Sequence, residues 1–575
     1  MLQIISGKFF QIARTYDTPH RGVFYTNYRL WNDVPIEVAQ GRLSPTPKDA
    51  GSGNIAYEII ERIEWSEPVP GVMISTGGEE LVSDFAAVMS FALNVTCTTD
   101  QDLASRLIAD PDPYSSKNVP RKYLRRIFDA QIDGTSVDGA ILNTFLTSLV
   151  GLRRREFVAI MKAIRRYVMA THRVADDASL AYSLLVMSVE ALSRTVDTPP
   201  ATWLEYDEAK RHVIDKALDG APDSVAERVR AAVLANAHAA VGRQFRDFVL
   251  DHLGLTFFRD EAVGCVNPVA RPSLAMALRA AYDLRSSYVH RLAGLPKLIA
   301  SPLGYSEMIE ADRAPHLTLE GLARLARHVI MQFVSRAPKV DHEAMDWFSA
   351  LPNIMRLPMA PHYWLGNPDR YGPETAGIWL ETFLGQLAAR LRGDANAIVT
   401  DLSPVLDKIE TLHLGSINAN HRRSIIALYH LFVIIFGKSG ERPHHKMILA
   451  KYGDIFNTSS VEELAIRLVI GEKSPWTLEQ QESLHRSYYV GRTNKNSLRL
   501  GGLFESLFTL RLAEANRVAG NEARARELIA FAVEAAPGQA ALTALEEALA
   551  SAALAPIDAD GILLPQAPVP KEVHA

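Results

Sequence analysis

The sequence predicts a mainly α protein with a β-containing, α+β domain at its N-terminus. Short β-branched and aromatic segments, separated by Pro, Gly, Asp and Asn, occupy about the first 120 residues. From about residue 140 onward, apolar residues recur at three- and four-residue spacing, which is typical of amphipathic helices. A chain of 575 residues, 48% of them hydrophobic, is long enough for several domains and can fold without metals or disulfides.

The N-terminal domain is expected over residues 1–135. One helix is predicted over residues 83–93, and the proline-rich stretch 111–120 indicates a loop or a boundary. Strands are predicted in four segments, which are residues 21–30, 34–43, 55–65 and 71–78.

Residues 140–337 are expected to form an all-α bundle. Residues 176–194 begin with acidic capping residues and are almost wholly apolar inside, which predicts a central helix. The other helices are predicted over residues 143–173, 225–254, 273–294 and 317–338.

The C-terminal region is expected to be helical over residues 345–555. Residues 510–539 resemble one tetratricopeptide-type hairpin, with small residues at packing positions and a Gly-Asn turn. A repeat array needs several such units to bury a continuous core, so one copy leaves the array open. The proline-rich tail, residues 556–575, is predicted to be disordered.

Composition excludes several classes of protein. Cys97 and Cys265 lie far apart, which excludes a disulfide framework and a cysteine-based zinc module. The apolar stretch 428–437 is about half the length of a membrane span, and the first residues make a poor signal peptide. The net charge of −5 provides no general attraction for nucleic acid. We therefore expect a soluble cytoplasmic protein that does not enter a membrane.

Arg285 and His290 form the candidate catalytic pair. His290 is the only one of the 17 histidines that follows an arginine after four intervening residues. The predicted helix around the pair is apolar at its start and polar at its end, which places that end at a surface or a cleft. A five-residue step turns a helix by about 140°, so the two side chains do not share one face. They would meet only if the long arginine side chain reached around the helix, or if a second copy of the helix supplied the other half of the site. The spacing suggests the second arrangement, a dimer cleft; the alternative to a functional pair is an interface arginine and a partly buried, hydrogen-bonded histidine.

Two blocks of sequence resemble the HEPN superfamily, and more closely its Apea-like branch. Residues 180–194, LAYSLLVMSVEALSR, match the apolar helix that ends in a Glu-Ala-Leu-like motif, here Glu190, Ala191 and Leu192. Residues 281–291, AYDLRSSYVHR, match the family's last core helix. The resemblance covers residues 150–335, and Ser286 stands where the family often has asparagine.

The resemblance implies a HEPN-like bundle and metal-independent RNA cleavage by a homodimer of the abortive-infection type. His290 would be the general acid and base, and Arg285 would hold the phosphate. Ser286 would orient the phosphate or the imidazole, and Glu190 would be a structural hydrogen-bond partner. Asp283 and Tyr288 would support the site, and Arg166 and Arg291 would contact RNA. No cofactor or metal is expected; the substrate would be RNA such as tRNA or mRNA, and a protein or phage-derived trigger would release the activity.

Other interpretations of the sequence remain open. The bundle could be a non-catalytic dimerisation scaffold, or an RNA-binding module that does not cut. Arginines at residues 153–155 and 165–166 suggest an RNA-facing stripe or, more simply, a solvated helix face. The basic and aromatic segment 485–499 suggests a single-stranded RNA contact or a polar loop between helices. The adjacent histidines at residues 444–445 lack an evident set of further metal ligands.

Overall fold

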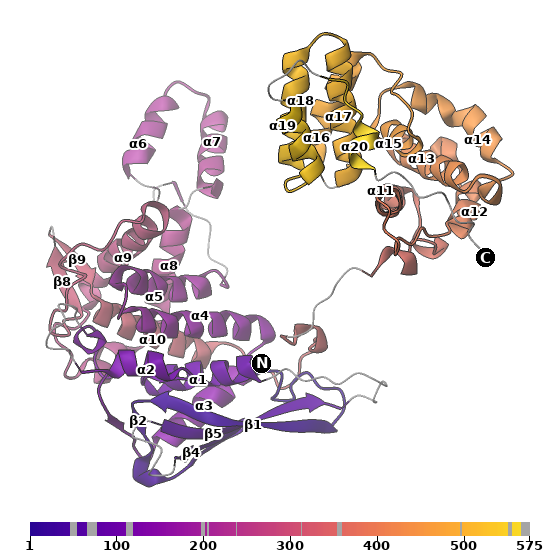
Figure 1. Ribbon diagram of the computed structural model, residues 1–575. Helices are drawn as coiled ribbons and strands as arrows, with labels where there is room; N and C mark the ends of the chain where they lie inside the picture. Colours follow the sequence, from indigo (N-terminus) through magenta and orange to yellow (C-terminus); the bar gives the residue numbers. More distant parts are fainter. Residues whose placement is uncertain are drawn as a thin grey trace. The chain divides into compact units, whose positions relative to one another are not determined.

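The computed structural model consists of two compact units, Met1–Arg356 and Leu357–Ala575 (Figure 1). Each unit has its own hydrophobic core. The boundary predicted between residues 135 and 140 falls inside the first unit, because one core spans both sides of it. The structure describes residues 1–46, 54–65, 78–110, 119–196, 202–203, 206, 208–236, 239–311, 313–352, 359–494, 497–549 and 555–564.

A five-stranded antiparallel sheet forms the N-terminal part of the first unit, in the order β3-β4-β5-β1-β6. Its strands are β1 (Thr15–Thr26), β3 (Ile36–Val38), β4 (Gly41–Pro45), β5 (Asn54–Glu64) and β6 (Cys97–Thr98). Strands β2 (Tyr28–Arg29) and β7 (Ile132–Asp133) pair separately. Most of the predicted strand at residues 71–78 lies outside the described residues.

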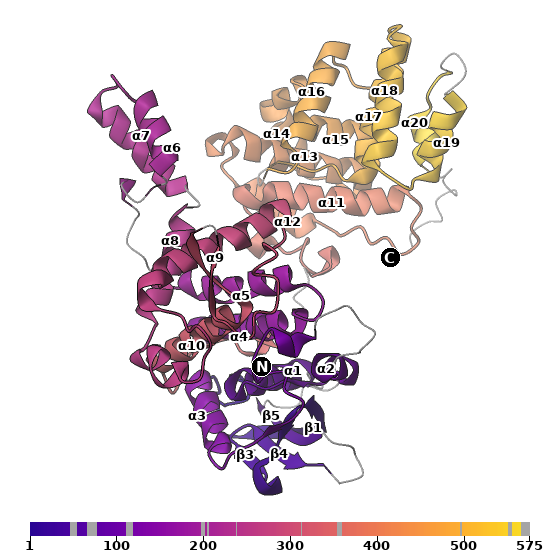
Figure 2. The same ribbon diagram turned by 90° about the vertical axis from the view of Figure 1, so that its left-hand side faces the viewer.

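Helices α1 (Glu79–Leu93) and α2 (Gln101–Ile108) lie along one side of this sheet (Figures 1 and 2). Phe24 of β1 stacks on Phe85 of α1 with ring centroids 6.1 Å apart. Both rings are buried, as are Ile55 and Ile59 of the neighbouring strand. The apolar side chains of alternate strand positions therefore attach the sheet to α1, and the predicted helix over 83–93 is confirmed within it.

The rest of the first unit is helical, with α5 at its centre. Helix α5 packs against α4, α8, α9 and α10, so the predicted central helix is confirmed. The helices are α3 (Asp138–Val150), α4 (Arg154–Arg173), α5 (Ala178–Ser193), α6 (Glu208–Ala217), α7 (Asp223–Asn236), α8 (Ala239–Asp251), α9 (Arg271–Arg291) and α10 (Leu319–Arg336).

Three expectations for this region are corrected. The helix predicted over 143–173 is two helices, because buried Leu152 leaves the helical path and pairs with Lys339 in a β-bridge. The helix predicted over 225–254 is divided between α7 and α8, with residues 237–238 outside the described part. The region is also not all-α, because β8 (Met308–Ala311) and β9 (Ala314–Leu317) form an antiparallel hairpin.

The second unit is helical throughout its described part. Its helices are α11 (Ala376–Leu391), α12 (Ser403–Thr411), α13 (Ala419–Phe436), α14 (His445–Tyr452), α15 (Val461–Ile470), α16 (Leu478–Gly491), α17 (Gly502–Val518), α18 (Glu522–Ala535), α19 (Ala540–Leu549) and α20 (Ala559–Leu563). Helices α17 and α18 pack together as the hairpin predicted over residues 510–539.

The predicted disordered tail is corrected for its first residues. Ile557 is buried, and the Arg511 guanidinium of α17 pairs with Asp560 at 2.8 Å. These contacts hold α20 against α17. Residues 565–575 lie outside the described part.

One described segment, Ala419–Gly440, is long and apolar enough by composition to cross a membrane. Half of its apolar window is buried inside the protein, and eight residues of α13 are buried in the second unit. This is the burial expected of a core helix in a folded domain, and it explains the apolar run without a membrane.

Candidate functional site

Helix α9 carries the candidate pair near its C-terminal end. The helix begins with Pro272 in its first turn and buries Leu274, Ala277, Leu278 and Ala281. It ends at Arg291, and Leu292 follows in the left-handed conformation with φ of 52°. The apolar first part thus packs in the bundle, while the polar last turns reach the surface.

Arg285 is directed toward α5 and forms a short ion pair there. Its Nη2 atom lies 2.5 Å from Oε2 of Glu190, and the two side chains are 13% and 4% exposed. The other carboxylate oxygen of Glu190 accepts a hydrogen bond from Nη2 of Arg194 at 2.6 Å. One buried carboxylate therefore holds two guanidinium groups, and this cluster retains one positive charge.

Aromatic rings complete the surroundings of Arg285. Its guanidinium carbon lies 5.7 Å from the centroid of the Tyr282 ring, which packs against Phe245 of α8 at 5.9 Å. Burial, followed by the charge of Glu190, raises the pKa of the Tyr282 phenol above its ordinary value. The Nε atom of Arg285 is buried and has no hydrogen-bond partner among the described residues.

His290 lies on a different face of the same helix. Its side chain is exposed, and within the described part of the chain neither ring nitrogen has a partner. Ser286 and Ser287 precede it by four and three residues and so lie beside it on the helix surface. Arg291, also exposed, donates from Nη2 to Oγ of Ser287 at 2.7 Å. Within one chain, the structure does not bring His290 and Arg285 together.

Tyr288 connects the end of α9 to the beginning of α5. Its hydroxyl donates to Oδ2 of Asp177 at 3.2 Å. The other carboxylate oxygen of Asp177 accepts from the backbone N–H groups of Ser179 and Leu180, which caps α5. Through this contact, Tyr288 positions the helix end that carries His290.

The remaining predicted residues are distributed over two helices. Ser286 is half-buried on α9, and Asp283 is exposed on the same helix. Arg166 is half-buried on α4, which packs against α1 and α5. The structure thus gathers Glu190, Tyr282 and Arg285 at one contact and leaves Arg166 on a separate helix.

Sequence reasoning missed Arg194, the second arginine on Glu190. Its signal was present, because Glu190 and Arg194 stand four residues apart on a predicted helix, the spacing at which side chains meet. Asp177 as the partner of Tyr288 carried no such signal, since 111 residues separate the two.

The proposed arginine stripe on α4 is largely engaged within the protein. Arg154 lies over the ring of Phe157 at 5.5 Å, and Arg155 donates to the carbonyl of Thr195. Arg165 pairs with Asp84 at 2.5 Å and with Glu80 at 3.0 Å. These contacts favour a structural role for the three arginines.

The basic and aromatic segment at residues 485–499 is also partly internal. His485 and Tyr488 are buried in α16, and the Tyr488 hydroxyl donates to Glu505 at 2.6 Å. Its first half is therefore helix rather than a polar loop, and these two rings are not available to stack on bases.

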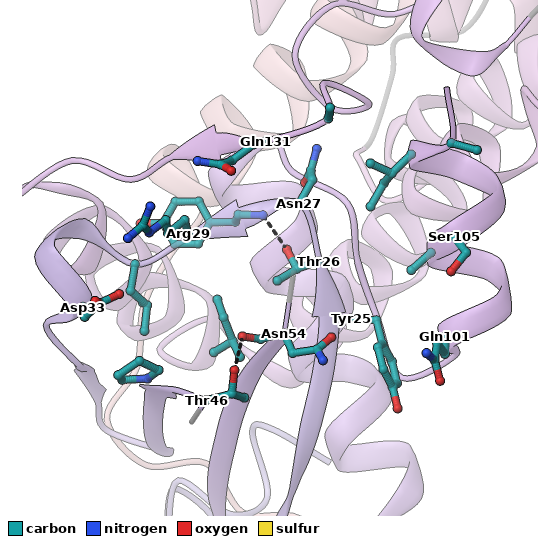
Figure 3. A pocket seen from close by; sticks show the side chains of 18 of the residues that line it. Tyr25, Thr26, Asn27, Arg29, Asp33, Thr46, Asn54, Gln101, Ser105 and Gln131 are labelled. Atoms are coloured by element: carbon teal, nitrogen blue, oxygen red, sulfur yellow. Dashed lines mark hydrogen bonds between the residues drawn. The ribbon is translucent and has the colours of Figure 1, made fainter. Parts of the chain in front are cut away.

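A separate cavity of about 730 Å³ lies beside the N-terminal sheet (Figure 3). Its wall includes Tyr25, Arg29 and Gln131. Thr26 and Asn27, which also line it, direct their hydrogen-bonding groups to the carbonyls of Thr96, Ile127 and Asp129. The cavity therefore has a polar wall in which these two buried side chains are already satisfied.

Among the described residues, no group of three or more His, Cys, Asp or Glu side chains is placed to hold a metal ion. Comparison of the chain with models of known families finds no match, and neither do comparisons with curated proteins and with solved structures.

Proposed function

We propose that the chain is a metal-independent endoribonuclease in which His290 is the general acid and base. The observation that carries the proposal is the position of His290: an exposed imidazole at a helix end, unpartnered within the described residues and flanked by serine hydroxyls. An imidazole titrates near neutrality and can both accept and donate a proton.

The reaction uses the RNA as its own nucleophile. His290 would accept the proton of a ribose 2′-hydroxyl as the oxygen attacks the adjacent phosphorus, and a protonated imidazole would donate to the departing 5′-oxygen. The products are a 2′,3′-cyclic phosphate and a 5′-hydroxyl end. Proton transfer of this kind contributes on the order of 10²–10⁴-fold to the rate.

Arg285 would stabilise the charge that develops on the phosphorane. Glu190 neutralises one of the two arginines around it, and one positive charge remains at this contact. Fixed positive charge placed where negative charge develops lowers the barrier. Arg291 beside His290 would hold the neighbouring phosphate.

A homodimer would complete the site, because His290 and Arg285 lie on different faces of α9. Val289 and Leu292 flank His290 and are 44% and 81% exposed. Apolar side chains exposed beside a candidate site favour an interface there. In a two-fold dimer, His290 of one copy would face Arg285 of the other.

The biological setting of the proposal rests on the resemblance of residues 180–194 and 281–291 to the Apea-like HEPN proteins. We place the enzyme in the cytoplasm, in antiviral defence of the abortive-infection type, acting on tRNA or mRNA. A protein or phage-derived trigger would release its activity.

A second candidate function is a non-catalytic scaffold. It is favoured by the short, buried pairing of Arg285 with Glu190, since a structural ion pair has this geometry. An RNA-binding module that does not cut would use the same arginines and would be indifferent to His290.

Cleavage of total cellular RNA by the purified protein in EDTA tests the proposal. The wild type should produce fragments with 2′,3′-cyclic phosphate ends, and His290→Ala should not. His212→Ala, which removes a histidine from α6 of the same unit, is the matched control and should cut like the wild type. Intact RNA with a folded, dimeric wild type would favour the scaffold.

Mixing two inactive variants tests the shared site. In a mixture of His290→Ala and Arg285→Lys chains, about half of the dimers are mixed, and each mixed dimer has one intact site. Activity should therefore return to about a quarter of the wild-type value. If the chains are shown to exchange and no activity returns, His290 of one chain and Arg285 of the other do not form a common site.

A further inference from the structure

The second unit contains a hollow of about 410 Å³ between the end of α12 and helix α14. Its wall is built from two stretches, within residues 409–416 and 444–452. This volume is in the range of sites that hold small molecules. The hollow lies in the second unit, and none of its residues belongs to the proposed ribonuclease site.

His444 is held in a fixed orientation at this hollow. Its Nδ1 atom lies 2.8 Å from Oε2 of Glu410, and the Tyr429 hydroxyl donates to Oε1 at 2.5 Å. The Glu410 side chain is 13% exposed, whereas the imidazole is 53% exposed. A carboxylate bound from both sides therefore orients an imidazole whose other nitrogen, Nε2, is unpartnered within the described chain.

Protonation supports this arrangement at neutral pH. Burial acts to raise the pKa of Glu410, but the hydrogen bonds from Tyr429 and His444 outweigh it and hold that pKa below its ordinary value. Burial, together with the same hydrogen bond, raises the pKa of Tyr429. The tyrosine thus remains a donor and the glutamate remains an ionised acceptor.

Positive charge exceeds negative charge around the hollow. Lys451 and His413 line it together with His444. The nearby Arg422 guanidinium contacts the carbonyl of Leu414, a wall residue, and lies over the ring of another wall residue, Tyr452, at 5.7 Å.

Arg442 lies beside Glu410 and pairs with Asp407 at 2.6 Å. The lysine and two arginines around the hollow (Lys451, Arg422 and Arg442) together carry three positive charges, against the two negative charges of Glu410 and Asp407. One positive charge is left over, which favours an anionic ligand.

The neighbouring histidines do not add to this charge. His430 and His445 share a hydrogen bond of 3.0 Å between Nδ1 and Nε2, and His445 stacks on Tyr429. Burial, and then the charge of His445, lowers the pKa of His430 to about 4, and burial lowers the pKa of His445 too. This neutral pair supports Tyr429 from behind and leaves recognition to His444, His413 and Lys451.

We propose that this hollow binds a small phosphate-bearing molecule, with His444 and Lys451 as its principal donors and Glu410 as the positioning residue of His444. A phosphate group presents several acceptor oxygens, which suits a hollow lined by a lysine and two imidazoles. The volume exceeds that of phosphate alone, and Leu412 and Met447 line the same hollow. The organic part of a phosphomonoester would contact these apolar side chains.

Calorimetric titration of the full-length protein with inorganic phosphate and with phenyl phosphate tests the site. Lys451→Ala and His444→Ala should each weaken binding about tenfold, as expected for the loss of one charged hydrogen bond. Lys446→Ala is the matched control, because Lys446 is exposed on the same helix and does not line the hollow. Glu410→Gln should weaken binding and change its pH profile, since it removes the charge that orients His444.

The two probes separate the sources of the phosphate. Tighter binding of phenyl phosphate would identify an organic phosphate as the ligand, and equal affinities would identify the free ion. Either result, with Lys451→Ala weakened and Lys446→Ala unchanged, supports the site. The proposal would be overturned if neither probe showed saturable binding up to about 20 mM. It would also be overturned if Lys451→Ala and Lys446→Ala weakened the affinity for the probes equally.

Discussion

Glu190 determines how the arginine of α9 is held, because its carboxylate is buried and serves two guanidinium groups. Removing one partner of a buried ion pair leaves an uncompensated charge, which costs more than the pair itself contributes. Here the cost is moderated because Arg194 remains beside the carboxylate. The pair therefore has a structural role whether or not Arg285 also contacts RNA.

Arg285→Ala should lower the free energy of unfolding of the first unit by about 2 kcal/mol. Adding Glu190→Gln should recover part of this loss, because the uncompensated charge is removed. Urea denaturation measures both effects. Arg279→Ala, at an exposed position of the same helix, should change stability by less than about 0.5 kcal/mol. Equal effects of the two arginine substitutions would contradict the pairing.

Glu320 is a second residue whose environment has a measurable consequence. Its carboxylate accepts the backbone N–H of Arg125 at 2.8 Å. Burial raises its pKa to about 7, since this hydrogen bond and the nearby arginines do not offset the desolvation. The folded protein thus holds a proton that the unfolded chain releases near pH 4.5.

The contribution of Glu320 to stability should decrease as the pH rises from about 4.5 to about 7, where the folded protein binds more protons than the unfolded chain. Glu320→Gln should remove this dependence and stabilise the first unit at pH 8 by about 3 kcal/mol. The amide oxygen can still accept the Arg125 N–H. Urea denaturation at pH 5 and pH 8 measures the difference; an unchanged pH dependence would show that Glu320 titrates normally.

At the scale of elements, the contact of α5 with α9 determines where His290 lies. Asp177 caps α5 and also accepts from Tyr288, so one carboxylate fixes the start of one helix and the end of the other. The capping residue and the apolar interior of α5 could be predicted from the sequence, because capping and helical periodicity are local. The crossing of α5 by α9 could not, because the residues in contact are 111 positions apart.

Asp177→Ala should lower the unfolding free energy by about 1–2 kcal/mol, since it removes the cap of α5 together with the Tyr288 contact. Asp176→Ala is the comparison, because the ion pairs of Asp176 with Arg106 and Arg173 are exposed. This substitution should lower the unfolding free energy by less than about 0.5 kcal/mol. Thermal unfolding of the two variants provides the measurement, and similar losses would argue against the cap.

At the scale of the whole molecule, two cores divide the chain near residue 357. Composition and periodicity indicated helices on both sides of this point, yet they did not show that the N-terminal sheet shares its core with the bundle. That sharing arises because α1 packs on both the sheet and α4.

Two matched core substitutions test the separate cores. Leu185→Ala in α5 and Leu428→Ala in α13 each remove a fully buried side chain and should cost about 3 kcal/mol. In differential scanning calorimetry, each variant should lower one transition and leave the other in place. A parallel shift of all unfolding in both variants would show that the two cores unfold as one.

The local features of this protein could be predicted from its sequence: the helical periodicity, the central apolar helix, the β-rich start and the position of Arg285 and His290 near a polar helix end. These follow from residue types within a few turns of one another. Contacts between distant parts of the chain set three other features: Leu152 divides a helix, residues 308–317 form a hairpin, and Arg285 is directed inward to Glu190 while His290 remains exposed. Each of these features depends on a contact with a residue far away in the sequence. The free energy of such a contact is set by tertiary packing, which residue types within a few helical turns do not encode.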